Sequence, residues 1–328
     1  MSLPAPLVAL GLDEARAAEV EALGGALSDL RRVTRLDRGW ATFQGEGPPE
    51  RLEFTTEPAV VVGDWVLVGA GGLQRLSRRT ELARRAGYRR DQRQALAANV
   101  DLVLCCRALD TELRVHRVAS LVVIAADSGA DPVVVLTKAD ASGDPEAARR
   151  AAARALGPVP IHVVSTRTGA GLEELARAVA GRTIVLLGES GAGKSTLTNA
   201  LVGTDLLETG AVRRDGQGRH TTTSRELVVL PSGGVVIDSP GIREAAAFAG
   251  GPGLDRAFAD VVALEAQCRF ADCAHDGVPG CALDAALRDG SLTEERRQLY
   301  LDEAGAQAWI EERLTRRAQR PTGRPRAR

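Results

Sequence analysis

Apolar and polar residues follow three different patterns along the chain. Between residues 31 and 93, short segments of alternating apolar and polar residues are separated by Gly and Pro, which predicts a small β-barrel. Between residues 93 and 249, continuous apolar runs such as 133–136 and 183–187 precede helical patterns, which predicts an α/β domain with buried strands. Residues 292–317 have apolar positions at helical spacing. We therefore expect an all-β part, an α/β part and a mainly helical part.

The most informative polar segment follows the apolar run 183–187. It reads GESGAGKS, which fits G-x-x-x-x-G-K-[ST], and it precedes a helical pattern that begins at Lys194. The glycines let backbone N–H groups surround phosphate, Lys194 supplies positive charge to the β- and γ-phosphates, and Ser195 is the expected Mg²⁺ ligand. A glycine-rich turn that binds nothing is the alternative, but it leaves the combination of strand, loop, lysine and helix unexplained. The predicted nucleotide-binding residues are Gly188, Glu189, Ser190, Gly191, Ala192, Gly193, Lys194, Ser195 and Thr196.

Composition draws attention to the same lysine. The chain has 42 Lys and Arg residues, and only two of them are Lys, at positions 138 and 194. A compact ammonium on a flexible stem and a planar guanidinium are not interchangeable. The use of Lys at these two positions in an Arg-rich chain therefore suggests that each position requires it.

The other lysine belongs to a segment that would select the base. The segment TKAD follows the apolar run 133–136, and its Asp carboxylate can accept hydrogen bonds from N1–H and the exocyclic amine of guanine, whereas adenine offers neither donor. A helix-capping turn is the alternative for this tetrapeptide alone. The downstream loop STRTGAG favours guanine because it resembles the loop that packs against the base in GTPases. The predicted GTP-binding residues of these two segments are Thr137, Lys138, Ala139, Asp140, Ser165 and Thr166.

Two further GTPase motifs follow the phosphate loop. The segment from Asp238 to Gly241 fits D-x-x-G, in which the Asp helps to hold Mg²⁺ and the Gly N–H senses the γ-phosphate. A threonine of the intervening segment GRHTTTS would complete the metal shell, and Thr222 and Thr223 are our candidates. The order is guanine motif, guanine loop, phosphate loop, switch threonines and D-x-x-G. In an ordinary GTPase the phosphate loop comes first, so the domain is predicted to be circularly permuted.

These motifs, with QALAANVDLVL before them and a Cys/His cluster after them, resemble the circularly permuted GTPases of the RsgA (YjeQ) family over roughly residues 31–300. The resemblance implies an N-terminal OB-fold barrel, a permuted P-loop GTPase domain and a C-terminal zinc-binding helical domain. It also implies GTP hydrolysis stimulated by the small (30S) ribosomal subunit, contact with its 16S rRNA and a role in its late maturation. The domains that we expect are an N-terminal extension, the barrel, the GTPase domain, and the zinc domain with its Arg-rich tail, at residues 1–30, 31–92, 93–249 and 250–328.

Two positions depart from common GTPase patterns. The family usually has Asn where Thr137 stands, so guanine preference would rest mainly on Asp140. Gly241 is followed by Ile242 and not by the Gln that orients water in Ras-like enzymes. His220 in the switch segment is the candidate for that task, because an imidazole can orient or deprotonate water near neutral pH and the resemblance implies this role. The alternative is a loop His that contacts only RNA or solvent.

The Cys/His cluster gathers three thiols and one imidazole within a short segment. Its residues are Cys268, Cys273, His275 and Cys281. Together they are a full tetrahedral zinc set with no position left open for substrate, so we predict one structural zinc per chain, as the family also has. A chance cluster or a redox pair is the alternative. The two remaining cysteines lie in an apolar run and are predicted to be buried strand residues.

The net charge of the chain is only −1, so charge indicates possible partners only where basic residues are concentrated locally. Residues 31–93 contain thirteen Arg against eight acidic residues, and the last sixteen residues contain seven Arg and no acid. A basic barrel suits contact with RNA phosphate, and Trp40 and Phe43 are either base-stacking residues or barrel core. The tail is either an electrostatic anchor or a solvated end. Without an 18-residue apolar stretch or a signal peptide, we expect a cytoplasmic monomer with no membrane contact.

The sequence therefore predicts a hydrolase that converts GTP and water to GDP and phosphate with Mg²⁺. Two alternatives stay open. One is a GTP-gated RNA-binding switch in which hydrolysis is incidental, and the other is a permuted GTPase that acts on the large subunit.

Overall fold

The computed structural model describes residues 2–37, 39–53, 59–69, 72–85, 93–203, 225–238, 252–275 and 277–318. The N-terminal extension is helical, with α1 (Ala5–Ala9), α2 (Glu14–Ala22) and the short 3-10 helix η1 (Leu27–Asp29). Helix α2 begins after Asp13 because this side chain accepts a hydrogen bond from the backbone N–H of Arg16 at 2.7 Å.

Antiparallel strands form a barrel-like part after the extension. They are β1 (Leu30–Asp37), β2 (Trp40–Gln44), β3 (Glu50–Glu53), β4 (Trp65–Gly69) and β5 (Gly72–Arg75). Strand β1 pairs with both β2 and β4, and the inward residues form a small core of their own, namely Val33, Ala41, Phe43, Val60 and Val66. Phe43 is therefore barrel core, whereas Trp40 is 40% exposed. A hairpin of β6 (Glu81–Arg85) and β7 (Arg93–Ala98) leads into the next part.

The α/β part alternates strands and helices. Its elements are β8 (Leu102–Ala108), α3 (Val115–Ser128), β9 (Asp131–Thr137), η2 (Ala139–Ala141), α4 (Pro145–Leu156), β10 (Ile161–Val163), α5 (Leu172–Ala178), β11 (Thr183–Leu187), α6 (Lys194–Val202), β12 (Arg225–Val229) and β13 (Val235–Asp238). Strands β8, β9, β10, β11 and β13 are parallel, and β12 is antiparallel to β13.

Both faces of this sheet are buried, which explains why its strands are continuous apolar runs. Alternate residues of β8 point to opposite faces: Val103 and Cys105 belong to one apolar core, and Leu104 and Cys106 belong to the other. Residues of α3 and α4 cover the first face, and residues of α5 and α6 cover the second. The prediction that Cys105 and Cys106 are buried strand residues is confirmed.

The order of strands in space is β10-β9-β8-β11-β13-β12. Strand β11, which precedes the phosphate loop, lies between β8 and β13, although β8, β9 and β10 all precede it in the chain. Because neighbouring parallel strands end at the same edge of a sheet, the segments after β9, β11 and β13 meet there. The permuted order of motifs along the chain therefore still leads to one site.

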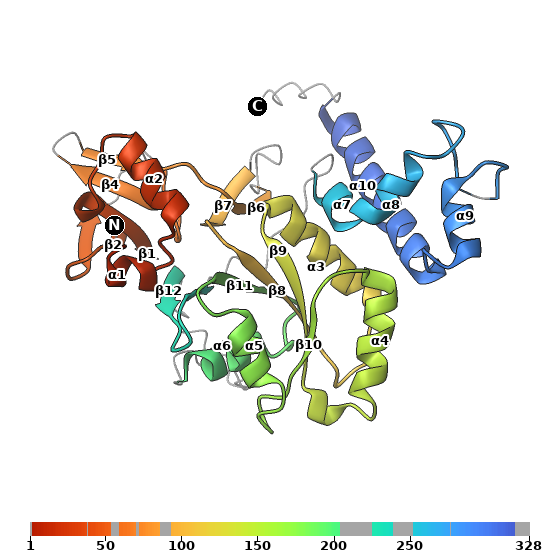
Figure 1. Ribbon diagram of the computed structural model, residues 1–328, viewed down its shortest axis with the longest axis horizontal. Coiled ribbons are helices and arrows are strands. Elements are labelled where there is room, and N and C mark those ends of the chain that lie inside the picture. Colours follow the sequence, from red (N-terminus) through yellow and green to blue (C-terminus); the bar gives the residue numbers. More distant parts are fainter. Residues whose placement is uncertain are drawn as a thin grey trace, which may run out of the picture.

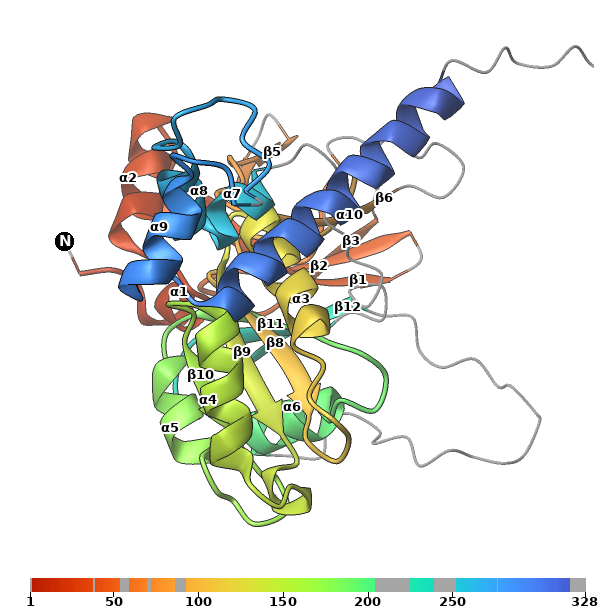
Figure 2. The same cartoon turned by 90° about the vertical axis from the view of Figure 1, so that its right-hand side faces the viewer.

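The described residues of the C-terminal part form the helices α7 (Gly253–Ala257), α8 (Ala259–Glu265), α9 (Ala282–Asp289) and α10 (Glu294–Ala318). They lie on the opposite side of the α/β part from the barrel (Figure 1). Helix α10 contacts α3 and α4, and it crosses them as one long rod (Figure 2). One hydrogen bond across this contact joins Ser120 Oγ of α3 to Glu303 of α10 at 2.7 Å. The predicted order of fold classes, all-β, α/β and mainly helical, is confirmed.

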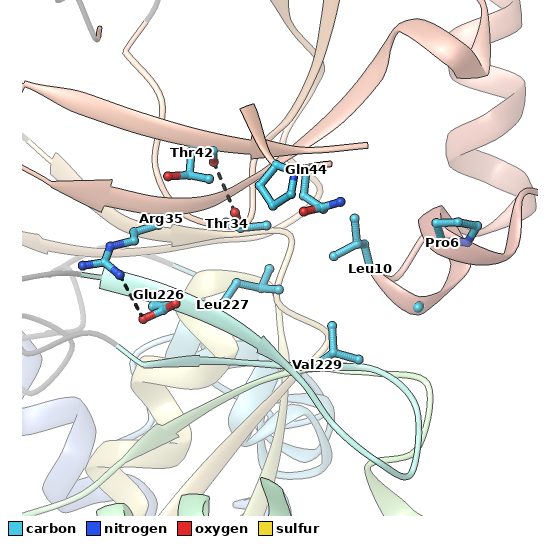
Figure 3. Close-up of a pocket in the computed structure, with 11 residues that line it drawn as sticks. Pro6, Leu10, Thr34, Arg35, Thr42, Gln44, Glu226, Leu227 and Val229 are labelled. Carbon is cyan, nitrogen blue, oxygen red and sulfur yellow. Dashed lines mark hydrogen bonds and ion pairs between the residues drawn. The ribbon is translucent and has the colours of Figure 1, made fainter. Parts of the chain in front are cut away.

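The barrel-like part and the α/β part share a continuous sheet, because β12 pairs with β1. Arg35 lies opposite Glu226 in this pairing, and their side chains form an ion pair at 3.7 Å. Figure 3 shows this junction, where β1, β2, β12 and the first helix surround a pocket. This pairing was not predicted from the sequence. Among the residues that the structure describes, we find no helix with the length and apolar content to cross a membrane.

Candidate nucleotide site and metal centre

The phosphate loop connects β11 to α6, as the sequence predicted. Gly188 has φ of 147°, and a Cβ at this position would collide with the carbonyl oxygen of Cys106 in the neighbouring strand. Gly193, the N-cap residue of α6, has φ of 78°, and α6 begins at Lys194. Glycine is required where the backbone is left-handed or approaches another strand closely. The two glycines therefore let the loop pass close to β8 and enter α6 directly, the strand–loop–helix connection that is typical of an anion-binding loop.

Lys194 is held inside the loop that it follows. Its ammonium donates hydrogen bonds to the carbonyl oxygens of Gly188 at 2.7 Å and Glu189 at 2.6 Å. The Glu189 carboxylate points to another strand, where it pairs with Arg107 at the end of β8 at 2.6 Å. The Lys194 charge therefore lies at the loop, while Glu189 ties the loop to its neighbouring strand. Ser190 and Thr196 are exposed.

Asp140 lies at the end of β9 in η2, and its two carboxylate oxygens have different partners. The Ser165 hydroxyl donates to one oxygen, and Arg167 donates to the other at 2.6 Å. The Ser165 hydroxyl, and after it the Arg167 guanidinium, hold the pKa of Asp140 below its usual value. The carboxylate is therefore anionic at neutral pH, the state that accepts hydrogen bonds from guanine.

The guanine loop is fixed to the guanine motif by its backbone. The Ala139 N–H donates to the carbonyl oxygen of Val164 at 3.1 Å, and Ser165 is buried. Gly171 has φ of 72°, and a Cβ there would collide with the carbonyl oxygen of Val163. Thr166 is half-buried next to Ser165. The structure thus brings together the two segments that the sequence assigned to guanine.

Two other members of the guanine motif point away from Asp140. The Lys138 ammonium forms an ion pair with Asp110 at 2.6 Å, and Lys138 itself has φ of 55°. Thr137 is buried, and its hydroxyl donates to the carbonyl oxygen of Ala192 in the phosphate loop at 2.8 Å. Thr137 therefore connects the guanine motif to the phosphate loop directly.

The structure describes one of the predicted switch residues. Asp238 ends β13, which runs parallel to β11, so Asp238 stands at the same edge of the sheet as Ser195 at the start of α6. A carboxylate and a hydroxyl are oxygen donors of the kind that Mg²⁺ takes. The assignment of both residues to a metal shell stays a prediction. The remaining predicted residues, His220, Thr222, Thr223 and Gly241, lie outside the described residues.

Sequence reasoning missed Arg107, Asp110 and Arg167, which bind Glu189, Lys138 and Asp140 respectively. Arg107 and Asp110 stand at and just after the end of β8, a strand that carries no GTPase motif. Their position becomes visible only when β8 is known to lie between β9 and β11. Arg167 lies inside the predicted guanine loop, and this position was the one feature of the sequence that could have pointed to its contact with Asp140.

The four predicted zinc ligands lie together at the C-terminal helices. One ligand atom from each of Cys268, Cys273, His275 and Cys281 falls within 4.8 Å of all the others. His275 Nδ1 is 3.7 Å from Cys268 Sγ and 3.6 Å from Cys281 Sγ. Zn–S and Zn–N bonds of about 2.3 and 2.0 Å in a tetrahedron place ligand atoms at about this separation. Three thiols and an imidazole at these distances fit a tetrahedral metal ion.

Comparisons with known proteins agree with this site. A family model described as RsgA GTPase matches residues 75–248. The chain is 45% identical to the small ribosomal subunit biogenesis GTPase RsgA of Streptomyces coelicolor, over 82% of this chain and 78% of that protein. It is 39% identical to small ribosomal subunit biogenesis GTPase RsgA 2 of Lactiplantibacillus plantarum, over 90% of this chain and 87% of that protein.

Two solved structures have a similar fold. YjeQ from Thermotoga maritima superposes with a TM-score of 0.65 at 24% identity, over 85% of this chain and 98% of that one. YloQ, described as a circularly permuted GTPase, superposes with a TM-score of 0.61 at 19% identity, over 91% and 96%. The circular permutation expected from the order of motifs therefore agrees with the fold.

Proposed function

The chain belongs to the RsgA GTPase family and is a hydrolase that acts on GTP, and we propose that it acts in late maturation of the small (30S) ribosomal subunit, which stimulates hydrolysis. The observation that carries this proposal is the extent of the likeness to the two biogenesis GTPases. It covers 82% and 90% of this chain, and so reaches beyond the GTPase domain into the flanking parts. The flanking parts are where a GTPase would contact its partner.

Guanine recognition is proposed to rest on Asp140. Its carboxylate would exchange the hydrogen bonds from Ser165 and Arg167 for bonds from N1–H and the exocyclic amine of the base. Arg167 is well placed to give way, because its side chain is 73% exposed. Ser165, Thr166 and Ala139 would line the base through the backbone of the two segments.

Phosphate binding is proposed to use the loop from Gly188 to Thr196. With GTP bound, the Lys194 ammonium would turn from the loop carbonyls to the β- and γ-phosphate oxygens. Ser195 and Asp238 would hold Mg²⁺, together with Thr222 or Thr223. The ion, when bound, neutralises the charge that develops on the phosphates. The Gly241 N–H would contact the γ-phosphate.

Attack by water is proposed to depend on His220, because Ile242 has no group that can orient water. The imidazole would hold or accept a proton from the water as its oxygen approaches the γ-phosphorus. Contact of the small subunit with the switch segment would place His220 beside the attacking water, which would account for stimulation.

The barrel-like part is proposed to contact 16S rRNA. The guanidinium of Arg51 lies over the Trp40 ring at 5.1 Å, and both residues belong to paired strands at one end of the sheet. Trp40 is 40% exposed, so its ring, together with the Arg51 guanidinium, would be accessible to a base. Phe43, the other aromatic residue considered for stacking, is buried in the core.

The metal of the Cys/His cluster is proposed to be zinc, one ion per chain, with a structural role. Four protein ligands complete its coordination, so no step of hydrolysis passes through it. We further propose that the protein is a monomer and acts in the cytoplasm. Small subunits mature in that compartment, and thiols stay reduced there and can bind metal.

Co-sedimentation tests the proposed partner. The full-length protein is mixed with purified small or large subunits in the presence of GDP or a non-hydrolysable GTP analogue. We expect it to pellet with small subunits and to do so more with the analogue than with GDP. Lys194→Ala, which lacks the phosphate-binding ammonium, should abolish the difference between nucleotides. Pelleting with large subunits instead, or equally with GDP and analogue, would contradict the proposal.

A GTP-gated RNA-binding switch is the second candidate function. The observation that favours it is the pairing of β12 with β1, which joins the strand between the two switch segments to the barrel. Co-sedimentation would look the same for this candidate. Only the rate of hydrolysis on the subunit separates the two functions.

A further inference from the structure

The ring of His275 has a different neighbour on each nitrogen. Its Nδ1 faces the thiols of Cys268 and Cys281, at 3.7 and 3.6 Å. Its Nε2 lies 2.9 Å from Oε1 of Glu265, the last residue of α8. A carboxylate in this position accepts the Nε2 proton, which leaves the Nδ1 lone pair for a metal ion.

The second oxygen of Glu265 is bound as well. The Tyr300 hydroxyl donates to Oε2 of Glu265 at 2.6 Å. Tyr300 lies on α10, is buried, and packs its ring against Phe258 with centroids 5.5 Å apart. Burial, and then the nearby Glu265, raise the pKa of Tyr300, so its hydroxyl keeps the proton that it donates. The Glu265 carboxylate is therefore fixed from both sides.

A second residue of α10 holds the backbone of the same histidine. His275 has φ of 57°, a conformation that few residues other than Gly adopt. The Arg297 guanidinium donates to the His275 carbonyl oxygen at 3.3 Å and to the Asp284 carboxylate of α9 at 3.0 Å. Arg297 and Tyr300 are three residues apart and so lie on one face of α10. Helix α10 thus contacts both the backbone of His275 and, through Glu265, its ring.

We propose that Glu265 and Tyr300 are positioning residues of the metal centre: Tyr300 orients Glu265, and Glu265 holds His275 as the Nε2–H tautomer with Nδ1 toward the metal. The proposal rests on the proposed zinc site. It also makes metal retention depend on a residue of α10, the helix that packs on α3 and α4 of the GTPase domain. Loss of an outer hydrogen-bonding partner of a metal ligand typically lowers metal affinity about 10- to 100-fold.

Zinc release from the full-length protein tests this assignment. Purified wild-type protein, Glu265→Ala, Glu265→Gln and Tyr300→Phe are first assayed for zinc content, and release is then followed with an excess of a chromogenic chelator. Glu303→Gln is the matched control, because Glu303 lies on α10 beside α3 and binds Ser120. The substitutions should leave the fold intact, because Glu265 ends its helix with a side chain that is 39% exposed and Phe keeps the ring that packs on Phe258.

We expect release from Glu265→Ala to be roughly 10- to 100-fold faster than from wild type, and release from Tyr300→Phe to be faster by a smaller factor. Glu265→Gln keeps an acceptor for the Nε2 proton and should recover part of the loss. Glu303→Gln should match wild type. In NMR spectra of the zinc-loaded proteins, the Nε2–H proton of His275 should resonate downfield in wild type relative to Glu265→Ala, because in wild type it donates to a carboxylate. A purely structural role of Glu265 would not require this difference.

The outcomes that overturn the proposal are distinct. Wild-type protein that carries about one zinc, with a Glu265→Ala variant that releases it at the wild-type rate, overturns the role of Glu265 alone. An Nε2–H resonance of His275 that is the same in zinc-loaded wild type and zinc-loaded Glu265→Ala also overturns it. Wild-type protein without zinc overturns the metal site and the positioning residues together.

Discussion

Thr137 occupies the position at which the family usually has Asn, and its contact explains how a shorter side chain can serve there. The hydroxyl reaches the carbonyl oxygen of Ala192 at 2.8 Å, and Thr137 is 3% exposed. A buried hydrogen bond thus joins the guanine motif to the phosphate loop. From the sequence, the shorter side chain was expected to serve only in part and to leave guanine preference mainly to Asp140; the bond from its hydroxyl to the phosphate loop is known from the structure.

Thr137→Val tests this connection. Valine has nearly the same shape but no donor, so the Ala192 carbonyl oxygen loses its partner and the phosphate loop loses a tether. We expect the GTP affinity to fall roughly fivefold to tenfold, which corresponds to the loss of about one buried hydrogen bond. Equilibrium binding of a fluorescent GTP analogue measures the effect. Thr137→Ser keeps the hydroxyl and should remain near wild type, and equal affinities for the Val and Ser variants would rule out the tether.

Asp140→Asn tests the choice of base. The substitution replaces one acceptor oxygen with a donor amide, which repels the exocyclic amine of guanine and suits the C2 carbonyl of xanthine. We expect GTP affinity to fall roughly 10- to 100-fold, with a shift of preference toward xanthosine triphosphate. Competition between the two nucleotides for the same protein measures the preference. Unchanged affinity for GTP would remove Asp140 from base recognition.

At the scale of elements, the local pattern of apolar and polar residues was sufficient to predict the strands and helices around the site. The runs 133–136 and 183–187 became β9 and β11 because parallel strands buried on both faces are apolar throughout. The pairing of β1 with β12 could not be predicted in this way. It joins residues such as Arg35 and Glu226, which are far apart in the chain, and alternation within a strand does not identify its neighbour.

Arg32 of β1 is a buried residue that forms hydrogen bonds at the junction between the barrel-like part and the α/β part. Its guanidinium donates to the carbonyl oxygens of Leu10 and Asn99 and to the Thr183 hydroxyl, and so contacts the N-terminal extension, the end of the hairpin and β11. The side chain lies 5.1 Å from the centre of the Trp65 ring and is fully buried. Burial lowers the pKa of Arg32 to about 10.

Arg32→Met should therefore lower the melting temperature by roughly 5 °C or more, because each buried acceptor that loses its donor costs about 1–3 kcal/mol. Arg31→Met is the matched control on the same strand, since Arg31 pairs with the exposed Glu50 at 3.3 Å. The other acceptors of Arg31, the carbonyl oxygens of Ser28 and Leu30, are local in the chain. The pKa of Arg32 in the folded protein is below its unfolded value, yet both lie well above neutral pH. The guanidinium is charged in both states, so the difference should be the same at pH 6 and pH 8. Thermal melts that show equal losses for the two variants would contradict this account of the junction.

At the scale of the whole molecule, the two flanking parts attach to different sides of the GTPase domain. The barrel-like part is bonded to β12, and the C-terminal helices pack on α3 and α4 (Figure 1). The D-x-x-G motif that starts at Asp238 precedes the C-terminal helices in the chain. The first switch segment leads into β12, which is bonded to the barrel-like part. A change of the switch segments on GTP binding or hydrolysis would therefore be connected to both flanking parts.

His220→Ala tests how the subunit would act on the switch segment. The phosphate loop and the guanine motif are untouched, so GTP affinity and binding to the small subunit should stay near wild type. The subunit-stimulated rate should fall roughly 10²-fold, the usual effect of removing a group that orients or deprotonates water. Single-turnover hydrolysis on the subunit measures this rate. A stimulated rate within about threefold of wild type would remove His220 from the mechanism and favour a ribosomal group supplied in trans.

The multiple-turnover rate of GTP hydrolysis by the wild-type protein, measured alone, with small subunits and with large subunits, tests the central claim most directly. We predict a slow rate alone and with large subunits. Small subunits should raise the rate at least roughly tenfold, which corresponds to about 1.4 kcal/mol of transition-state stabilisation. Equal rates in all three mixtures would favour a GTP-gated switch over a subunit-stimulated enzyme. Stimulation by large subunits alone would contradict the proposed partner.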